Sequence, residues 1–146
     1  MTTTAILRLE YLCAVIPPLL KAIDEEVFSS KPHPEKWSKK QIVGHLIDSA
    51  TNNHQRFVRV QFEDKPLIRY DQDKWNDFTH YQQMNSLHVI GFWEAYNKHL
   101  VQIIKHIPKE ALSRECQVGD NTFTLDFLIN DYVHHMEHHL RQVVSY

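Results

Sequence analysis

The chain has 146 residues, of which 42% are hydrophobic and 23% are charged, the composition of a soluble globular protein with a substantial core. Its net charge of −2 and the lack of a basic stripe exclude a typical nucleic-acid surface. Three glycines are too few for a turn-rich β fold, so the composition favours helices.

The first predicted helix runs from about Ala5 to Glu26. Pro17 and Pro18 interrupt it, and we expect a kink or two short helices there because proline removes a backbone donor. After a proline-containing connector, Ser38 and Gln41 form the pattern of a capping box. This cap starts a second helix that we expect to continue to about Gln61.

Residues 62–85 form a long crossover, in which a short helix is predicted around Trp75 and Phe78. The third helix is predicted over Ser86–Ile107, ending before Pro108, because its apolar residues recur at helical spacing. A turn at 119–121 predicts a small hairpin between Cys116 and Phe123. The fourth helix is predicted from Thr124 almost to Tyr146.

Four amphipathic helices joined by one long crossover predict an all-α fold, a four-helix bundle. The short connector makes the first two helices antiparallel. The crossover of about 24 residues is long enough to return along a helix, so the second and third helices can run parallel. We expect one domain, residues 1–146.

The isolated cysteines Cys13 and Cys116 argue against a disulfide framework, and neither has neighbours in the sequence that would activate a thiol. No apolar run is predicted to reach the roughly 20 residues of a membrane span. The charged N-terminal stretch is also unlike a signal peptide. We therefore expect a cytoplasmic protein without a membrane or nucleic-acid partner.

The stretch YVHHMEHHLRQ, residues 132–142, holds four of the eleven histidines. At about 100° per residue, His135 and His139 share the stripe of Leu128 and Tyr132, which faces the core. His134 and His138 fall with Glu137 on the opposite, polar side. Histidines four residues apart on a helix can converge on one ion. The inward pair, His135 and His139, is therefore a candidate pair of metal ligands.

A stable metal site needs a third ligand, and His45 in the second helix is the candidate. It follows the Ser38 cap by seven residues. His139 and His135 precede a fourth-helix end near Val144 by about five and nine residues. If these helices are antiparallel, the three histidines lie at the same height, whereas parallel helices would separate them by about 5–10 Å. The alternative is three core histidines satisfied by hydrogen bonds.

Other polar residues have weaker patterns. Asp48 is either a hydrogen-bonding partner of a metal ligand or a solvated helix residue, and Asp48 and Arg56 are guesses for a pocket rim. Asn53 and Tyr132, on the inward stripes, line a cavity or simply pack. Glu137 faces away from the candidate site, and no general acid or base is assigned. Three further histidines of the third helix are expected on the surface: His88, His99 and His106.

The stretches KWSKKQIVGHLIDSATNNHQRF and YVHHMEHHLRQ together resemble the DinB/YfiT-like family of metalloenzymes, and the resemblance covers nearly the whole chain. It implies a four-helix bundle in which His45, His135 and His139 hold a divalent metal, with Zn, Ni, Mn and Fe all compatible. His134 departs from the family pattern and, with His138, leaves the choice of ligand pair open.

The resemblance implies a metal-dependent enzyme, either a hydrolase or a transferase of low-molecular-weight thiols onto small-molecule electrophiles. In both, the metal makes a bound water or thiol nucleophilic. The alternative is a bundle that binds a metal or small ligand without turnover. A homodimer is also expected. The sequence does not identify the substrate or the metal.

Overall fold

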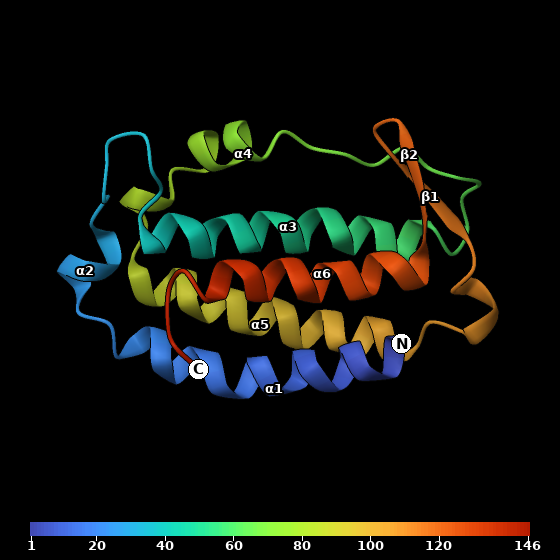
Figure 1. The fold of residues 1–146 in the computed structure, drawn as a ribbon, viewed down its shortest axis with the longest axis horizontal. Coiled ribbons are helices and arrows are strands. Elements are labelled where there is room, and N and C mark those ends of the chain that lie inside the picture. The colour runs from blue at the N-terminus through green and yellow to red at the C-terminus, as the bar shows by residue number, and fades with distance from the viewer.

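Four long helices form the body of the protein in a computed structural model that describes all 146 residues (Figure 1). The helices α3 and α5 lie side by side. The helix α1 packs against α5, α6 packs against α3, and α1 and α6 also pack against each other. Figure 1 shows α3 and α5 running in one direction and α1 and α6 in the other. The four-helix bundle, with its parallel second and third long helices, is confirmed. The long helices are α1 (Thr2–Lys21), α3 (Lys39–Arg59), α5 (Ser86–Lys105) and α6 (Leu125–Leu140).

Short elements connect the long helices. The connector after α1 contains α2 (Glu25–Ser29). The crossover after α3 contains α4 (Gln72–Thr79), as predicted around Trp75, and the 3₁₀ turn η1 (Tyr81–Gln83). A second 3₁₀ turn, η2 (Lys109–Ala111), precedes the predicted hairpin, whose strands are β1 (Glu115–Val118) and β2 (Asn121–Thr124).

The first helix is not divided into two short helices at the prolines, which was one of the two expected alternatives. Pro17 and Pro18 lie inside a continuous α1, and the chain leaves the helix only after Lys21. Pro17 is buried, whereas Pro18 is exposed. The predicted helix to Glu26 is therefore divided beyond the prolines, with Glu26 in the separate α2.

The start of α3 has the predicted capping box. The Ser38 side chain accepts a hydrogen bond from the Gln41 backbone N–H, and the Gln41 side chain accepts one from the Ser38 N–H. These contacts satisfy backbone donors that a helix start otherwise leaves unpaired. The cap fixes where the first turns of α3 begin, and His45 lies in the second turn.

The last helix ends earlier than predicted. The helix α6 begins after the Thr124 cap, as expected, but its regular part stops at Leu140 rather than near Val144. Residues 141–144 continue as a turn in which the Val143 and Val144 N–H groups both donate to the Leu140 carbonyl. His139 consequently lies in the last turn of α6, beside the first turns of α3 at the same end of the bundle (Figure 1).

The helix α1 is long and apolar enough to cross a membrane by length and composition alone. The expectation that no stretch meets this length is therefore wrong for α1. However, α1 packs against α5 and α6, and it contributes Leu9, Leu12, Ile16 and Leu20 to the common core. A core helix of a bundle passes the same test of length and composition, so this test does not indicate a membrane span.

Candidate metal centre

Three histidines from two antiparallel helices converge at one end of the bundle. One nitrogen from each of His45, His135 and His139 lies within 4.8 Å of those from the other two. The Nε2 atoms of His45 and His135 are 3.2 Å apart, and the three pairs of ring centroids are separated by 4.7–5.0 Å. The structure thus brings together the three histidines singled out in the sequence, although the α6 end used to compare their heights was misplaced.

The three rings are held in the uncharged form that metal binding requires. Burial, followed by the nearby His135 and His139, lowers the pKa of His45 to about 3. Burial and the adjacent His139 and His138 lower the pKa of His135 to about 4. Burial also lowers the pKa of His139, against a hydrogen bond to Gln142 that raises it. At neutral pH all three imidazoles therefore offer a lone pair.

Two neighbouring side chains hold the orientation of two of the three rings. The Trp37 ring, just before the α3 cap, packs on the buried His45 with ring centroids 4.9 Å apart. The Gln142 Oε1 atom lies 3.1 Å from Nδ1 of His139. The amide oxygen accepts the Nδ1 proton in the neutral ring, so the lone pair is on Nε2.

The donor set fits a divalent metal. Three neutral imidazoles are a common ligand set for Zn and for other transition metals of intermediate softness. Two nitrogens that lie about 2.0–2.1 Å from a zinc ion and are 3.2 Å apart subtend roughly 100° at the ion, close to a tetrahedral angle. The His45 to His135 spacing therefore suits ligation without a large movement of either helix.

An open groove of about 820 Å³ is connected to the candidate site through two shared residues, and none of the three histidines lines it. Trp37 and Gln142 line it and also contact His45 and His139, so these two residues join the groove to the candidate site. The rest of its wall is mainly polar, with acidic and basic side chains from α2, the connector and α4. The lining residues are Glu26, Val27, Ser30, Pro32, Glu35, Lys36, Trp37, Lys39, Ile42, Gln72, Asp73 and Gln142.

The helical wheel placed Glu137 on a solvated face of the fourth helix. The structure contradicts this prediction. The Glu137 side chain is buried and accepts hydrogen bonds from Arg8 of α1 and from the Tyr146 hydroxyl. The hydrogen bond from Arg8 lowers the pKa of this carboxyl. The wheel failed because Arg8, 129 positions away in the chain, covers this face. Glu137 does face away from the three histidines, as expected.

Asp48 is also buried rather than solvated. Tyr81 of η1 donates a hydrogen bond to its Oδ1 atom, and burial raises the pKa of Asp48 to about 6. Its hydrogen-bond partner is thus a tyrosine, not one of the three histidines. Arg56 lies eleven residues beyond His45, roughly 16 Å along α3, and donates to the Ile68 carbonyl of the crossover. Arg56 is therefore not at the rim of this site.

The remaining candidate site residues are either exposed to solvent or packed in the core, outside the group of three converging histidines. His134 and His138 are exposed, and the group of converging nitrogens includes neither. His88, His99 and His106 are exposed, as expected. Asn53 and Tyr132 are buried and bond to other protein groups, Ser49 and Asn97 respectively, so they pack rather than line the groove.

Two residues of the site, Trp37 and Gln142, were not identified from the sequence. Gln142 follows His139 by three residues, a spacing at which helical side chains meet. This spacing, within residues 132–142, could have predicted the contact. Trp37 precedes a strong helix cap by one residue, but its contact with His45 depends on how the connector folds back. The groove involves α2 and α4 and has no local sequence pattern.

The profile of the DinB superfamily matches residues 8–143. The chain belongs to the DinB superfamily. A Bacillus cereus (strain AH820) relative named "putative metal-dependent hydrolase" is 24% identical over 147 residues, covering 99% of this chain and 84% of the relative. The family resemblance seen in the sequence is thereby confirmed.

Two solved structures share the fold. YfiT from Bacillus subtilis, described as having an unusual four-helix bundle topology, matches with a TM-score of 0.87 and 21% identity, over 97% of this chain and 83% of YfiT. A mycothiol-dependent maleylpyruvate isomerase matches with a TM-score of 0.77 and 10% identity, over 96% of this chain and 60% of the isomerase. At these identities the likeness concerns the fold.

Proposed function

We propose that this DinB superfamily member is a metal-dependent enzyme in which His45, His135 and His139 hold a divalent ion. The observation that carries the proposal is the convergence of three neutral imidazoles beside an open groove. A divalent ion on three imidazoles keeps a coordination position free and lowers the pKa of a bound water or thiol. The names of relatives favour a hydrolase.

The protein's own residues prepare the site for such chemistry. The buried His45 ring cannot rotate freely because Trp37 covers it. Gln142 fixes the tautomer of His139, and the groove that Trp37 and Gln142 line is the proposed approach of a small molecule to the site. Zn, Ni, Mn and Fe all remain compatible with this set of donors.

Transfer of a low-molecular-weight thiol is the second candidate reaction. Its support is the shared fold of the mycothiol-dependent isomerase, which the chain matches over 60% of that protein's length. A bundle that binds a metal or a small ligand without turnover is the non-catalytic alternative. A cytoplasmic location, a homodimer and the absence of nucleic-acid and membrane partners stay predictions.

Metal analysis of untagged protein tests the ligand set. Protein purified from metal-supplemented medium should carry about one divalent ion per chain, and His139→Ala should lose it. His138→Ala is the matched control, because His138 is the exposed neighbour of His139 on the same turn. An unloaded wild type, or equal metal content in both variants, would contradict the proposed site.

Turnover distinguishes an enzyme from a binding protein. A panel of esters, amides and thiol-plus-electrophile pairs should reveal an activity that a chelator removes and a divalent metal restores. The same activity should be absent in His139→Ala and present in His138→Ala. Metal-loaded protein without turnover on the panel would favour the binding alternative.

A further inference from the structure

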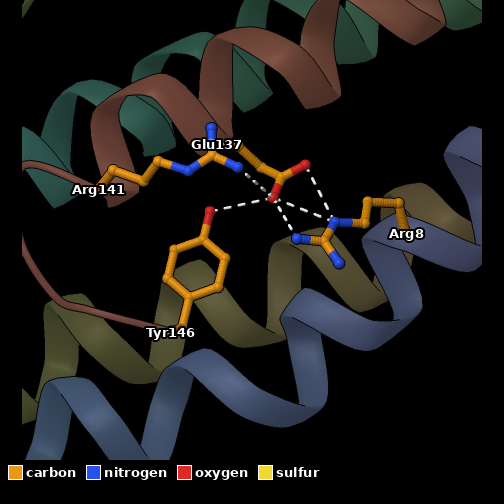
Figure 2. Close-up of polar contacts among 4 residues, drawn as sticks. All are labelled: Arg8, Glu137, Arg141 and Tyr146. Carbon is orange, nitrogen blue, oxygen red and sulfur yellow. Dashed lines mark hydrogen bonds and ion pairs between the residues drawn. The ribbon is translucent and has the colours of Figure 1, made fainter.

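Glu137 joins the metal-ligand helix to the end of the chain. It lies midway between His135 and His139, and two residues on a helix turn the side chain by about 200°, so it points to the opposite side. There the Arg8 Nε atom donates to both carboxylate oxygens at 3.0 Å, and the Tyr146 hydroxyl donates to Oε1 at 3.0 Å. Figure 2 shows these contacts, with Arg141 near the same oxygen at 3.6 Å.

Segment 141–146 is held at two further points. The Val143 side chain is buried, and its carbonyl accepts a hydrogen bond from Lys39 Nζ at 2.6 Å, which ties the segment to the start of α3. Between Arg141 and Val143, Gln142 faces Nδ1 of His139 at 3.1 Å. The position of Gln142 therefore depends on contacts on both sides of it in the chain.

His139 is one of the two ligand candidates that are only partly buried. His45 is fully buried and covered by Trp37, whereas His139 is only partly buried. Nδ1 of His139 is also the only Nδ1 of the three rings with a hydrogen-bond partner in the protein, and Nδ1 of His45 is buried without one. Partners of this kind set the tautomer and orientation of metal-binding histidines.

We propose that Glu137 and Tyr146 are positioning residues, which hold segment 141–146 so that Gln142 orients His139 toward the metal. The inference rests on the proposed function, because it needs a metal at the three histidines. In the alternative explanation, Glu137 only ties α6 to α1 through Arg8. The Tyr146 hydroxyl separates the two, because its removal leaves the Arg8 ion pair in place.

Metal affinity measured by competition with a chelator, with Zn and with Co as the probe ions, tests the proposal on the whole chain. Gln142→Ala should weaken the Kd about 10–100-fold, the usual effect of losing such a partner. Tyr146→Phe should weaken it less, by several-fold. Gln142→Glu keeps an acceptor for Nδ1 and should retain tight binding. The Co visible absorption should change in Gln142→Ala, since the orientation of a ligand changes.

The double variant tests whether Tyr146 affects metal affinity through Gln142. If Tyr146 acts through Gln142, Gln142→Ala combined with Tyr146→Phe should bind no more weakly than Gln142→Ala alone. Tyr11→Phe is the matched control: Tyr11 also contacts Arg8, and its ring remains in the variant. Melting of the metal-free variants verifies that each is folded.

The outcomes separate this inference from the proposed function. Wild-type affinity in both Gln142→Ala and Tyr146→Phe, or additive losses in the double variant, would overturn the positioning role while leaving the metal site in place. A wild type that binds neither ion would overturn both.

Discussion

At the residue scale, Gly44 shows how the metal-ligand helix accommodates its neighbours. A Cβ atom at this position would lie 2.2 Å from Cδ2 of Tyr81, far inside van der Waals contact. The Tyr81 ring can therefore lie against α3 only because residue 44 has no side chain. From there its hydroxyl reaches Asp48, one turn along the helix. In the stretch GHLIDS, Gly44 and Asp48 together seat Tyr81 of the crossover, and His45 between them faces α6.

Gly44→Ala should destabilise the protein. Tyr81 would have to move and lose its bond to Asp48, and overpacking of this kind costs roughly 1–3 kcal/mol. Gly91→Ala is the matched control, because nothing lies within 4 Å of its added Cβ in α5. Alanine there should stabilise by about 0.5–1 kcal/mol through helix propensity. Urea unfolding at pH 7 measures both, and losses of similar size would disprove the close contact.

Single residues also show what the sequence could predict. His45, His135 and His139 were identified because inward positions on a helix follow from spacing, and the family resemblance selects the same three. Glu137 was misjudged because its burial depends on Arg8, from the other end of the chain. Spacing within one helix tells which residues share a face, but it does not tell which distant segment covers that face.

At the scale of elements, the start of α3 links local and tertiary structure. Ser38 caps the helix, and its buried hydroxyl also donates to the Gln82 side chain of η1 at 2.5 Å. Gln82 in turn donates to the Ser29 carbonyl at the end of α2. One serine thus connects three elements around the end of the bundle where the candidate metal site lies.

Ser38→Ala should therefore cost more than the loss of an ordinary cap. Removing a cap typically costs about 0.5–2 kcal/mol, and Ser38→Ala also leaves the Oε1 atom of Gln82 without its donor. Asn85→Ala is the comparison, since exposed Asn85 caps α5 by a single bond to the His88 N–H. Urea unfolding should show the larger loss for Ser38→Ala. Equal losses would mean that the Ser38 to Gln82 contact contributes nothing to stability.

The elements differ in how well local signals define them. The start of α3 was predicted because a capping box is encoded within four residues. The end of α6 was placed too late because no glycine or proline follows it. Contacts of Val143 with Lys39 and of Tyr146 with Glu137 instead hold the chain after Leu140. Similarly, Pro17 and Pro18 remain in α1 because packing of the bundle retains the helix around them.

At the scale of the whole molecule, buried titratable groups make the stability of the metal-free protein depend on pH. His45 and His135 have folded pKa values of about 3 and about 4, below the unfolded value of 6.5, so the unfolded chain binds more protons as the pH falls below 6.5. Their contribution to stability is lost on acidification. Asp48 acts in the opposite direction, because its folded pKa of about 6 exceeds 3.8. Its protonation favours the fold between these two values.

The two histidine shifts are together larger than the Asp48 shift, so the metal-free protein should lose stability on acidification. From pH 7.5 to 4.5 we expect a loss of roughly 3 kcal/mol, at about 1.4 kcal/mol for each pKa unit of proton uptake. Urea unfolding in the presence of a chelator measures this loss of stability.

Two variants test which groups cause the loss. Asp48→Asn removes the opposing contribution and should make the loss of stability steeper between pH 6 and 4, whereas His45→Gln should make it shallower. A pH-independent stability, or the reverse order of these two variants, would mean that His45 and His135 are not held neutral in the folded protein. These two candidate ligands would then lack the free lone pairs that metal binding needs.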